Sequence, residues 1–295
     1  MEPVPAASAA SRACHDALAV FVRAHPRLFV LTGAGVSTGS GIPGYRNHAG
    51  QWQRKQPITH QAFTGSAAAR QRYWARSMIG FKVMAHAAPN AAHAALARLE
   101  QAGRIEQLVT QNVDGLHQRA GSTRVTELHG SIRQVVCLDC DVTVPRAQVQ
   151  AQLEAANPAF VAHTAKIAPD GDADLDAADF AAFEIPACTD CGGMLKPDVV
   201  FFGASVPRAR VDAAMAALMR ADAVLVAGSS LMVRSGYRFC EHAHALGKPL
   251  VAVNMGHTRA DALLHLKIES DCAAALTYAA ALLAPLPQAA KRPEV

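Results

Sequence analysis

The stretch Gly33-Ala-Gly-Val-Ser-Thr-Gly-Ser-Gly-Ile-Pro-Gly-Tyr-Arg46 decides the fold of this chain. It follows the apolar run Leu28–Leu31, which is typical of a buried parallel strand. A strand that runs into glycines and small hydroxyls forms a loop whose backbone N–H groups can approach a pyrophosphate closely. The alternative is a glycine-rich surface turn. The dehydrogenase fingerprint would place its third glycine where this chain has Thr38. The sequence therefore predicts a dinucleotide site with a long loop that folds over its ligand.

Further strand-like runs predict a doubly wound parallel, Rossmann-like α/β sheet. They lie at 105–109, 223–226 and 249–253 and alternate with alanine-rich helical stretches. A mostly helical insertion is expected at 58–104 and a second insertion at 133–197. We expect the catalytic domain to span 27–283, after an N-terminal extension with a first helix (1–26) and before a disordered tail (284–295).

Polar residues follow two of these strands. Gln111, Asn112, Val113 and Asp114 come after the run at 105–109, at the sheet edge where ligands collect in open α/β folds. His129 ends another short strand that begins at Val125. A lone histidine in such a place is more often structural, but a cysteine pair only eight residues further on favours a functional region.

Two C-x2-C pairs predict a zinc site. The pairs are Cys137 with Cys140 and Cys188 with Cys191, and four cysteine ligands form a closed tetrahedral site. Because no position stays open for water, the zinc should support structure rather than activate a nucleophile. Four unrelated free thiols are the alternative. Between the pairs we expect a helix at 146–156 and a solvated acidic loop at 170–176, which lacks the spacing of a calcium-binding EF-hand.

The composition narrows the class of protein. The chain has 295 residues, of which 51% are hydrophobic and 18% charged, so global disorder is excluded. A net charge of +4 suits an anionic cofactor and is too small to indicate nucleic acid. No apolar run is long enough to span a bilayer, and the N-terminus resembles neither a secretory signal nor an arginine-rich transit peptide. With seven cysteines that form no oxidising framework, the expected location is cytoplasmic, and a monomer is the default.

Several motifs together resemble the sirtuin family. From about Arg27 to about Leu283 the order is GAGVSTGSGIPGYR, TQNVDGLH, ELHG, the paired C-x2-C, KPDVVFFG, AGSSL and VNMG. The segments 70–76, 168–172 and 235–239 look like the class II branch, which includes the mitochondrial lipoamidase-type sirtuin and its bacterial relatives. The resemblance implies an NAD-dependent protein-lysine deacylase that acts on acyl-lysine proteins, holds one structural Zn²⁺, and releases nicotinamide and 2′-O-acyl-ADP-ribose.

The resemblance also implies roles for single residues. His129 would be the general base that takes a proton from a ribose hydroxyl, and an imidazole that titrates near neutrality suits that task. Asn112 with Ser37 would hold the nicotinamide ribose and an ordered water, and Asp114 would bind the carboxamide. The full set of implied NAD contacts is Gly33, Ala34, Gly35, Ser37, Thr38, Ile42, Pro43, Tyr45, Arg46, Gln111, Asn112, Val113, Asp114, Gly228, Ser229, Ser230, Asn254, Met255, Gly256 and Cys272.

Substrate contacts are implied in the same way. The peptide backbone would pair as a strand between Val200, Phe201, Phe202 and Gly203 on one side and residues 228–233 on the other, a mode that reads little sequence. Tyr73-x2-Arg76 has the pattern with which some sirtuins bind a carboxylate on the acyl group; a tyrosine and an arginine on a helix surface are the alternative. We expect acidic or long acyl groups to outcompete acetyl. For the acidic loop, the class II resemblance implies an alternative to a solvated face, a flap that borders the acyl channel.

Three other functions fit parts of the sequence. Mono-ADP-ribosyl transfer to protein would use the same NAD site, because it also begins by expelling nicotinamide. An NAD-binding regulator would not need Asn112, Asp114 and His129 together. A nicotinamide oxidoreductase is disfavoured by Thr38 and by the closed zinc site.

Overall fold

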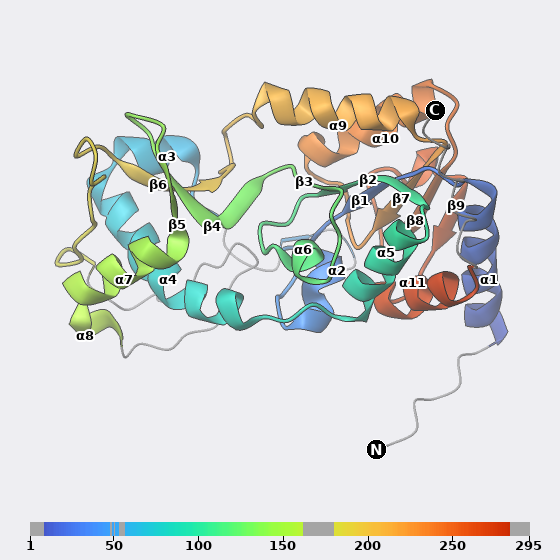
Figure 1. Cartoon of the computed structure of the whole chain (residues 1–295), viewed down its shortest axis with the longest axis horizontal. Coiled ribbons are helices and arrows are strands. Elements are labelled where there is room, and N and C mark those ends of the chain that lie inside the picture. The colour runs from blue at the N-terminus through green and yellow to red at the C-terminus, as the bar shows by residue number, and fades with distance from the viewer. Residues whose placement is uncertain (1–8, 48, 50, 53–56, 162–179, 284–295) are drawn as a thin grey trace, which may run out of the picture.

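A six-stranded parallel sheet forms the larger lobe of the computed structural model, which describes residues 9–47, 49, 51–52, 57–161 and 180–283 (Figure 1). The strand order is β3-β2-β1-β7-β8-β9. From β1 the strand order runs outward in one direction to β2 and β3, and from the neighbouring β7 it runs outward in the other direction to β8 and β9. This reversal between β1 and β7 makes the sheet doubly wound. The strands are β1 (Leu28–Thr32), β2 (Ile105–Thr110), β3 (Val125–Glu127), β7 (Ala223–Ala227), β8 (Leu250–Val253) and β9 (Leu266–Ile268).

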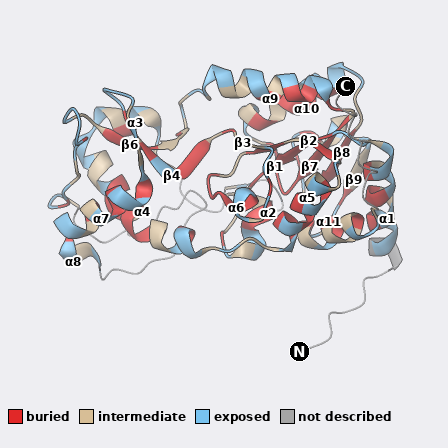
Figure 2. Ribbon diagram, viewed as in Figure 1, coloured by how far each residue is buried: buried red, intermediate tan, exposed pale blue. Residues whose placement is uncertain are grey.

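Helices cover both faces of this sheet. Successive residues of β1 point to opposite sides, so that Leu28 and Val30 belong to one apolar cluster and Phe29 and Leu31 to another. Because both faces are covered, β1 and β7 are buried along their whole length (Figure 2). The first cluster includes residues of α1 (Ala9–Ala24), α5 (Ala91–Gln101) and α11 (Cys272–Ala281), and the second includes residues of α9 (Arg208–Arg220) and α10 (Arg234–Ala245).

The smaller lobe combines parts of both insertions. Its three-stranded antiparallel sheet, in the order β5-β4-β6, consists of β4 (Gly130–Cys137), β5 (Thr143–Pro145) and β6 (Leu195–Val199). Helices α3 (His60–Gly65) and α4 (Ala67–His86) come from the first insertion, whereas α7 (Arg146–Ala156) and α8 (Pro158–Val161) come from the second. Phe63 and Trp74 pack with Val135 and Val149 in one apolar cluster. Neither insertion therefore has a core of its own.

Four short helices connect the larger elements. They are α2 (Ala34–Ser37), η1 (Thr38–Ser40), α6 (Leu116–Arg119) and η2 (Asp261–Leu263).

The predicted doubly wound sheet with an inserted four-cysteine module is confirmed. All four predicted strands are present, and α7 has the predicted bounds 146–156. One refinement concerns the first insertion, because α5 packs on the sheet with α1 and α11 rather than on α4. The predicted acidic loop at 170–176 and the predicted tail at 284–295 lie outside the described residues.

In the part of the chain that is described, every helix is too short or too polar to cross a membrane.

Candidate active site

A cavity of about 650 Å³ opens at the carboxyl ends of the central strands. Loops that follow β1, β2, β7 and β8 line one side of it, and the segment after β6 lines another. This is the edge at which an open α/β sheet places its ligand. The cavity therefore lies where the sequence predicts the dinucleotide.

The glycines of the first loop allow two loops to interlock. A Cβ atom on Gly35 would lie 2.8 Å from the carbonyl oxygen of Gly228, and a Cβ on Gly33 would lie 2.9 Å from the Cβ of Ser229. Gly228 adopts φ +61°, and a Cβ there would lie 2.3 Å from the backbone nitrogen of Val36. The Gly35 N–H donates to the Gly228 carbonyl at 2.8 Å. Side chains at these positions would separate the loops after β1 and β7.

A buried hydrogen-bond network joins three of the predicted residues. The Ser37 hydroxyl donates to Oδ2 of Asp114 at 2.7 Å, and Asn112 Nδ2 donates to the same hydroxyl at 3.0 Å. Asn112 also donates to the Gly33 carbonyl at 3.1 Å. The second Asp114 oxygen accepts the Leu116 N–H at 2.9 Å. These bonds fix the positions of the three side chains in the cavity wall.

Two histidines behind this network were missed from the sequence. His93 Nε2 lies 3.5 Å from the Ser37 hydroxyl, and the rings of His93 and His117 have centroids 4.8 Å apart. His117 Nε2 lies 2.9 Å from Oγ1 of Thr32. Burial lowers the pKa of His93 to about 4 and that of His117 to about 3. Both rings are therefore neutral at neutral pH. The spacing Asn90-x2-His93, a helix capping box, is a signal that could have located one of them.

His129 is held at both ring nitrogens. Its Nδ1 lies 2.9 Å from the carbonyl oxygen of Gln111, and its Nε2 lies 2.7 Å from Oγ of Ser235. Burial lowers the pKa of His129 to about 4; the hydrogen bond to Gln111 acts in the opposite direction, and the positive charges of Arg210 and Arg238 lower the pKa further. The expectation that this imidazole titrates near neutrality is therefore corrected. At neutral pH it is an unprotonated base.

The predicted peptide strand forms another part of the wall. Val200, Phe201, Phe202 and Gly203 line the cavity, as does the segment 228–233. The Val200 N–H donates to the His129 carbonyl at 2.8 Å, which ties this segment to the histidine.

Trp52 is a second feature that was missed from the sequence. Its ring packs on Phe202 with centroids 5.7 Å apart, and the Arg46 guanidinium lies 4.2 Å above it. Tyr45 contacts the same ring edge-on at 6.1 Å. Trp52 therefore joins the loop that carries Tyr45 and Arg46 to the predicted peptide strand.

Most of the predicted cofactor residues line the cavity; Pro43 and Gly256 do not. Tyr73 and Arg76 are also absent from its wall. Tyr73 is buried and packs on Phe201 with ring centroids 5.0 Å apart, so it lies one ring behind the cavity. Arg76 is half-buried on the same helix, α4. Their role in acyl recognition stays a prediction.

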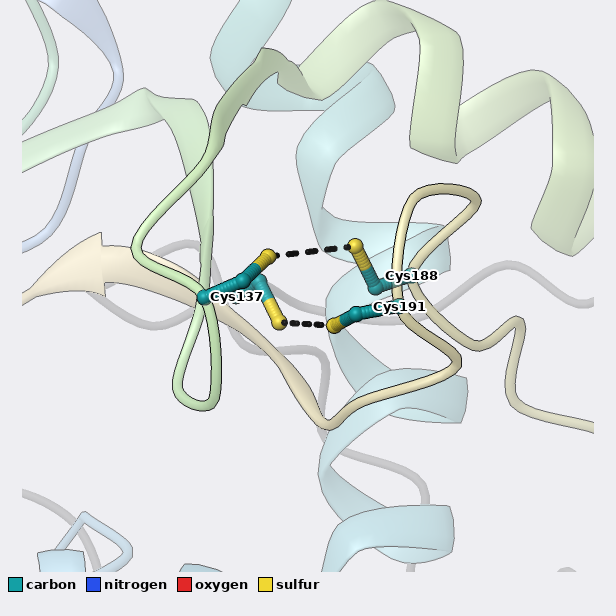
Figure 3. A group of neighbouring side chains, drawn as sticks. Cys137, Cys188 and Cys191 are labelled. Carbon is teal, nitrogen blue, oxygen red and sulfur yellow. Dashed lines mark hydrogen bonds between the residues drawn. The ribbon is translucent and has the colours of Figure 1, made fainter.

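The four cysteines converge in the smaller lobe. Their sulfur atoms all lie within 4.8 Å of one another; those of Cys137 and Cys191 are 3.5 Å apart and those of Cys140 and Cys188 are 3.8 Å apart (Figure 3). Tetrahedral zinc with sulfur at about 2.3 Å requires sulfur atoms about 3.8 Å apart. The donor set and its spacing fit one zinc ion with no open position. Cys137 and Cys188 belong to the core cluster of this lobe.

Fold and cavity together define a dinucleotide-binding α/β protein with an inserted cysteine module. Residues 33–235 match the model of the Sir2 family, described as SIR2: Sir2 family. The chain belongs to this family, which confirms the resemblance stated from its motifs.

Named relatives agree with this assignment. The chain is 56% identical over 264 residues to a NAD-dependent protein deacetylase of Xanthomonas axonopodis pv. citri, and this alignment covers 90% of each of the two chains. It is 57% identical over 257 residues to a protein of the same name from Bordetella bronchiseptica, covering 87% of this chain and 94% of the relative. It is 47% identical to the NAD-dependent protein lipoamidase sirtuin-4, mitochondrial, of Bos taurus, covering 85% and 81%.

Solved structures show the same fold. One described as "Sir2-p53 peptide-NAD+" has a TM-score of 0.73 and 30% identity, covering 88% of this chain and 94% of the other. A second, described as "Structural Basis for the Mechanism and Regulation of Sir2 Enzymes", has a TM-score of 0.72 and 31% identity, covering 92% and 97%.

Proposed function

We propose that this protein is an NAD-dependent protein-lysine deacylase. The observation that carries the proposal is one cavity, into which the Ser37–Asn112–Asp114 network and His129 both open. The relatives named NAD-dependent protein deacetylase at 56–57% identity support the same activity. No observation favours mono-ADP-ribosyl transfer over deacylation.

The residues present fit NAD. The interlocked loops around Gly35 and Gly228 bring backbone close to the cavity, and a volume of about 650 Å³ suits a ligand of this size. The Asp114 carboxylate would accept from the carboxamide, Ser37 and Asn112 would hold the adjacent ribose, and Asn254 would approach the adenosine ribose. When bound, NAD supplies an ADP-ribosyl carbon whose bond to nicotinamide can be broken.

The protein's task is then to place a weak nucleophile, the amide oxygen of acyl-lysine, in line with that carbon. Holding two reactants in the correct geometry can supply roughly 7–11 kcal/mol of the barrier. A peptide strand between 200–203 and 228–233 would deliver the lysine, in keeping with the relative whose structure is described with a p53 peptide and NAD.

His129 would take the proton of a ribose hydroxyl. The Gln111 carbonyl fixes a hydrogen on Nδ1, so the lone pair is on Nε2. Because the pKa is about 4, this nitrogen is available as a base throughout the neutral range.

One structural zinc would hold the smaller lobe together through the four cysteines. For the acyl group, the pattern Tyr73-x2-Arg76 and the lipoamidase name of one relative support activity on groups other than acetyl. The cytoplasm is the proposed location.

The proposal is tested by nicotinamide release from NAD in the presence of acetyl-, succinyl-, glutaryl- and lipoyl-lysine peptides, with mass spectrometry of the products. We expect 2′-O-acyl-ADP-ribose with at least one acyl class and its loss in His129→Ala, by a factor on the order of 10²–10⁴. ADP-ribose attached to protein without an acyl product would replace the proposal with the transferase. NAD binding without turnover of any peptide would also overturn it.

A further inference from the structure

Ser235 lies against the candidate base. It is the second residue of α10, and its hydroxyl oxygen is 2.7 Å from Nε2 of His129. Both residues line the cavity. Ser235 belongs to the motif at 235–239 that marked the class II branch in the sequence, to which no chemical role was assigned.

The direction of this hydrogen bond follows from the other ring nitrogen. A carbonyl oxygen only accepts, so the contact of 2.9 Å between Nδ1 and the Gln111 carbonyl requires the hydrogen on Nδ1. A neutral imidazole then has its single lone pair on Nε2. The Ser235 hydroxyl must be the donor in the contact with that lone pair.

The surrounding packing holds this arrangement in place. A Cβ atom on Gly236 would lie 2.5 Å from Oε1 of Gln111, so the first turn of α10 packs directly on Gln111. The Gln111 side chain in turn donates to the Ser229 hydroxyl at 2.8 Å and to the Thr32 carbonyl at 3.2 Å. The groups that contact the two nitrogens of His129 therefore belong to one packed unit.

We propose that Ser235 is a proton relay between the substrate hydroxyl and His129. Nε2 has one lone pair, and the hydroxyl of Ser235, which lines the same cavity, occupies it; the Gln111 carbonyl occupies the other nitrogen. In the relay the proton of the ribose hydroxyl passes to Oγ of Ser235, while the serine's own proton passes to Nε2. The serine is restored, the imidazole becomes an imidazolium, and the ribose oxygen keeps the electron pair with which it attacks.

This relay rests on the proposed deacylase function. The alternative for the same contact is a serine that only caps the base and swings away when substrate enters. The two roles predict different changes in the rate of acyl transfer. Removing a cap leaves the rate unchanged or raises it, whereas removing a relay lowers it.

The test is the rate of acyl transfer in Ser235→Ala, Ser235→Thr and Ser235→Val, measured in a single turnover with NAD and the best acyl-lysine peptide. Threonine keeps the hydroxyl, and valine has nearly the same shape without it. We expect Ser235→Thr to retain most of the rate and Ser235→Ala and Ser235→Val to lose roughly 10- to 100-fold, with NAD affinity unchanged. His244→Ala, an exposed position on the same helix, is the control that should leave the rate unchanged.

Two outcomes would overturn the relay. One is a Ser235→Ala enzyme as fast as wild type or faster, which means that the serine is only a cap. The other is an equal loss in all three variants, which means that shape matters rather than the hydroxyl. Failure of the proposed function would look different, since wild type would then release no acyl product from any peptide.

Discussion

The two lobes of this molecule are stable for different physical reasons. The larger lobe has a sheet whose central strands β1 and β7 are buried along their whole length, with an apolar cluster on each face. The smaller lobe has a three-stranded sheet whose strand β5 is partly exposed, one apolar cluster, and four converging thiols. A large core stabilises a sheet by itself, whereas a small one generally needs a metal or a second element.

The smaller lobe also contains a buried charge, whose removal from water costs free energy of folding. Arg146 is fully buried, and its Nε and Nη1 atoms have no hydrogen-bond partner. Its guanidinium lies over the rings of Phe81 and Trp74, and burial lowers its pKa to about 10. A lobe that carries such a charge depends more strongly on its other contacts.

Loss of the zinc site should have the largest effect on the difference in stability between the two lobes. We expect Cys188→Ala to unfold the smaller lobe, because zinc binding contributes about 10–16 kcal/mol in small zinc domains. Hydrogen exchange should then show loss of protection in β4, β6 and α7 but continued protection in β1, β7 and β8. Cys240→Ala, a buried cysteine of the larger lobe outside the cluster, is the matched control and should leave the protection pattern intact. Loss of protection in both lobes together would contradict the separation.

Acid should weaken the larger lobe through its buried histidines. His93 and His117 have a pKa of about 4 and about 3 in the folded chain, against 6.5 as the ordinary value. The unfolded chain therefore binds more protons below pH 6.5, and the free energy of unfolding falls as the pH drops toward 4. The slope is about 1.4 kcal/mol per pH unit for each ring. Denaturant unfolding between pH 7 and 4 should show it, and His117→Gln should reduce it; an unchanged slope in that variant would contradict the assignment.

Gly228→Ala should loosen the larger lobe at the cavity without touching the smaller one. A Cβ at this residue meets the Val36 nitrogen at 2.3 Å and must also adopt a positive φ. We expect a loss of about 1–3 kcal/mol in stability and weaker NAD binding. Gly247→Ala is the matched control, since Gly247 has φ +66° with nothing within 4 Å of an added Cβ, so it measures backbone strain alone. Equal losses in both variants would mean that the two loops do not need to interlock.

Arg146→Met should have the smallest effect, and it should stabilise the smaller lobe rather than weaken it. Replacing a buried and incompletely paired charge by an apolar side chain is often neutral or stabilising. We expect the smaller lobe to gain up to about 1 kcal/mol, measured by hydrogen exchange of β4 and β6 in the zinc-bound protein. A loss of several kcal/mol would show that the guanidinium holds the lobe together.

The difference between the lobes also explains what could be predicted from the sequence. The strand β1 was predicted from its uninterrupted apolar run before glycines, and the zinc cluster from its spacing. β9 was missed because it has three residues with a lysine in the middle. The pattern of α5 indicated a helix but could not indicate which lobe it packs against.

Contacts between distant residues account for the rest. His93, His117 and Trp52 gain their place near the cavity from partners far along the chain, such as Ser37, Thr32 and Phe202. No local pattern records these pairings, although the capping box at Asn90 was visible. Ser235 lay within a recognised motif, but only the folded chain brings its hydroxyl to His129.

The placement of the two tryptophans gives the molecule its own optical probes. The chain has only Trp52 and Trp74; one lines the cavity between the loop of Arg46 and Phe202, and the other is fully buried in the smaller lobe. The emission of an indole ring depends on its surroundings. Trp74→Phe would leave only Trp52, whose fluorescence would report ligand binding in the cavity. Trp52→Phe would leave only Trp74, whose fluorescence would report whether the smaller lobe is folded. Binding and unfolding of the smaller lobe could thus be followed separately in two single-tryptophan variants without any added dye.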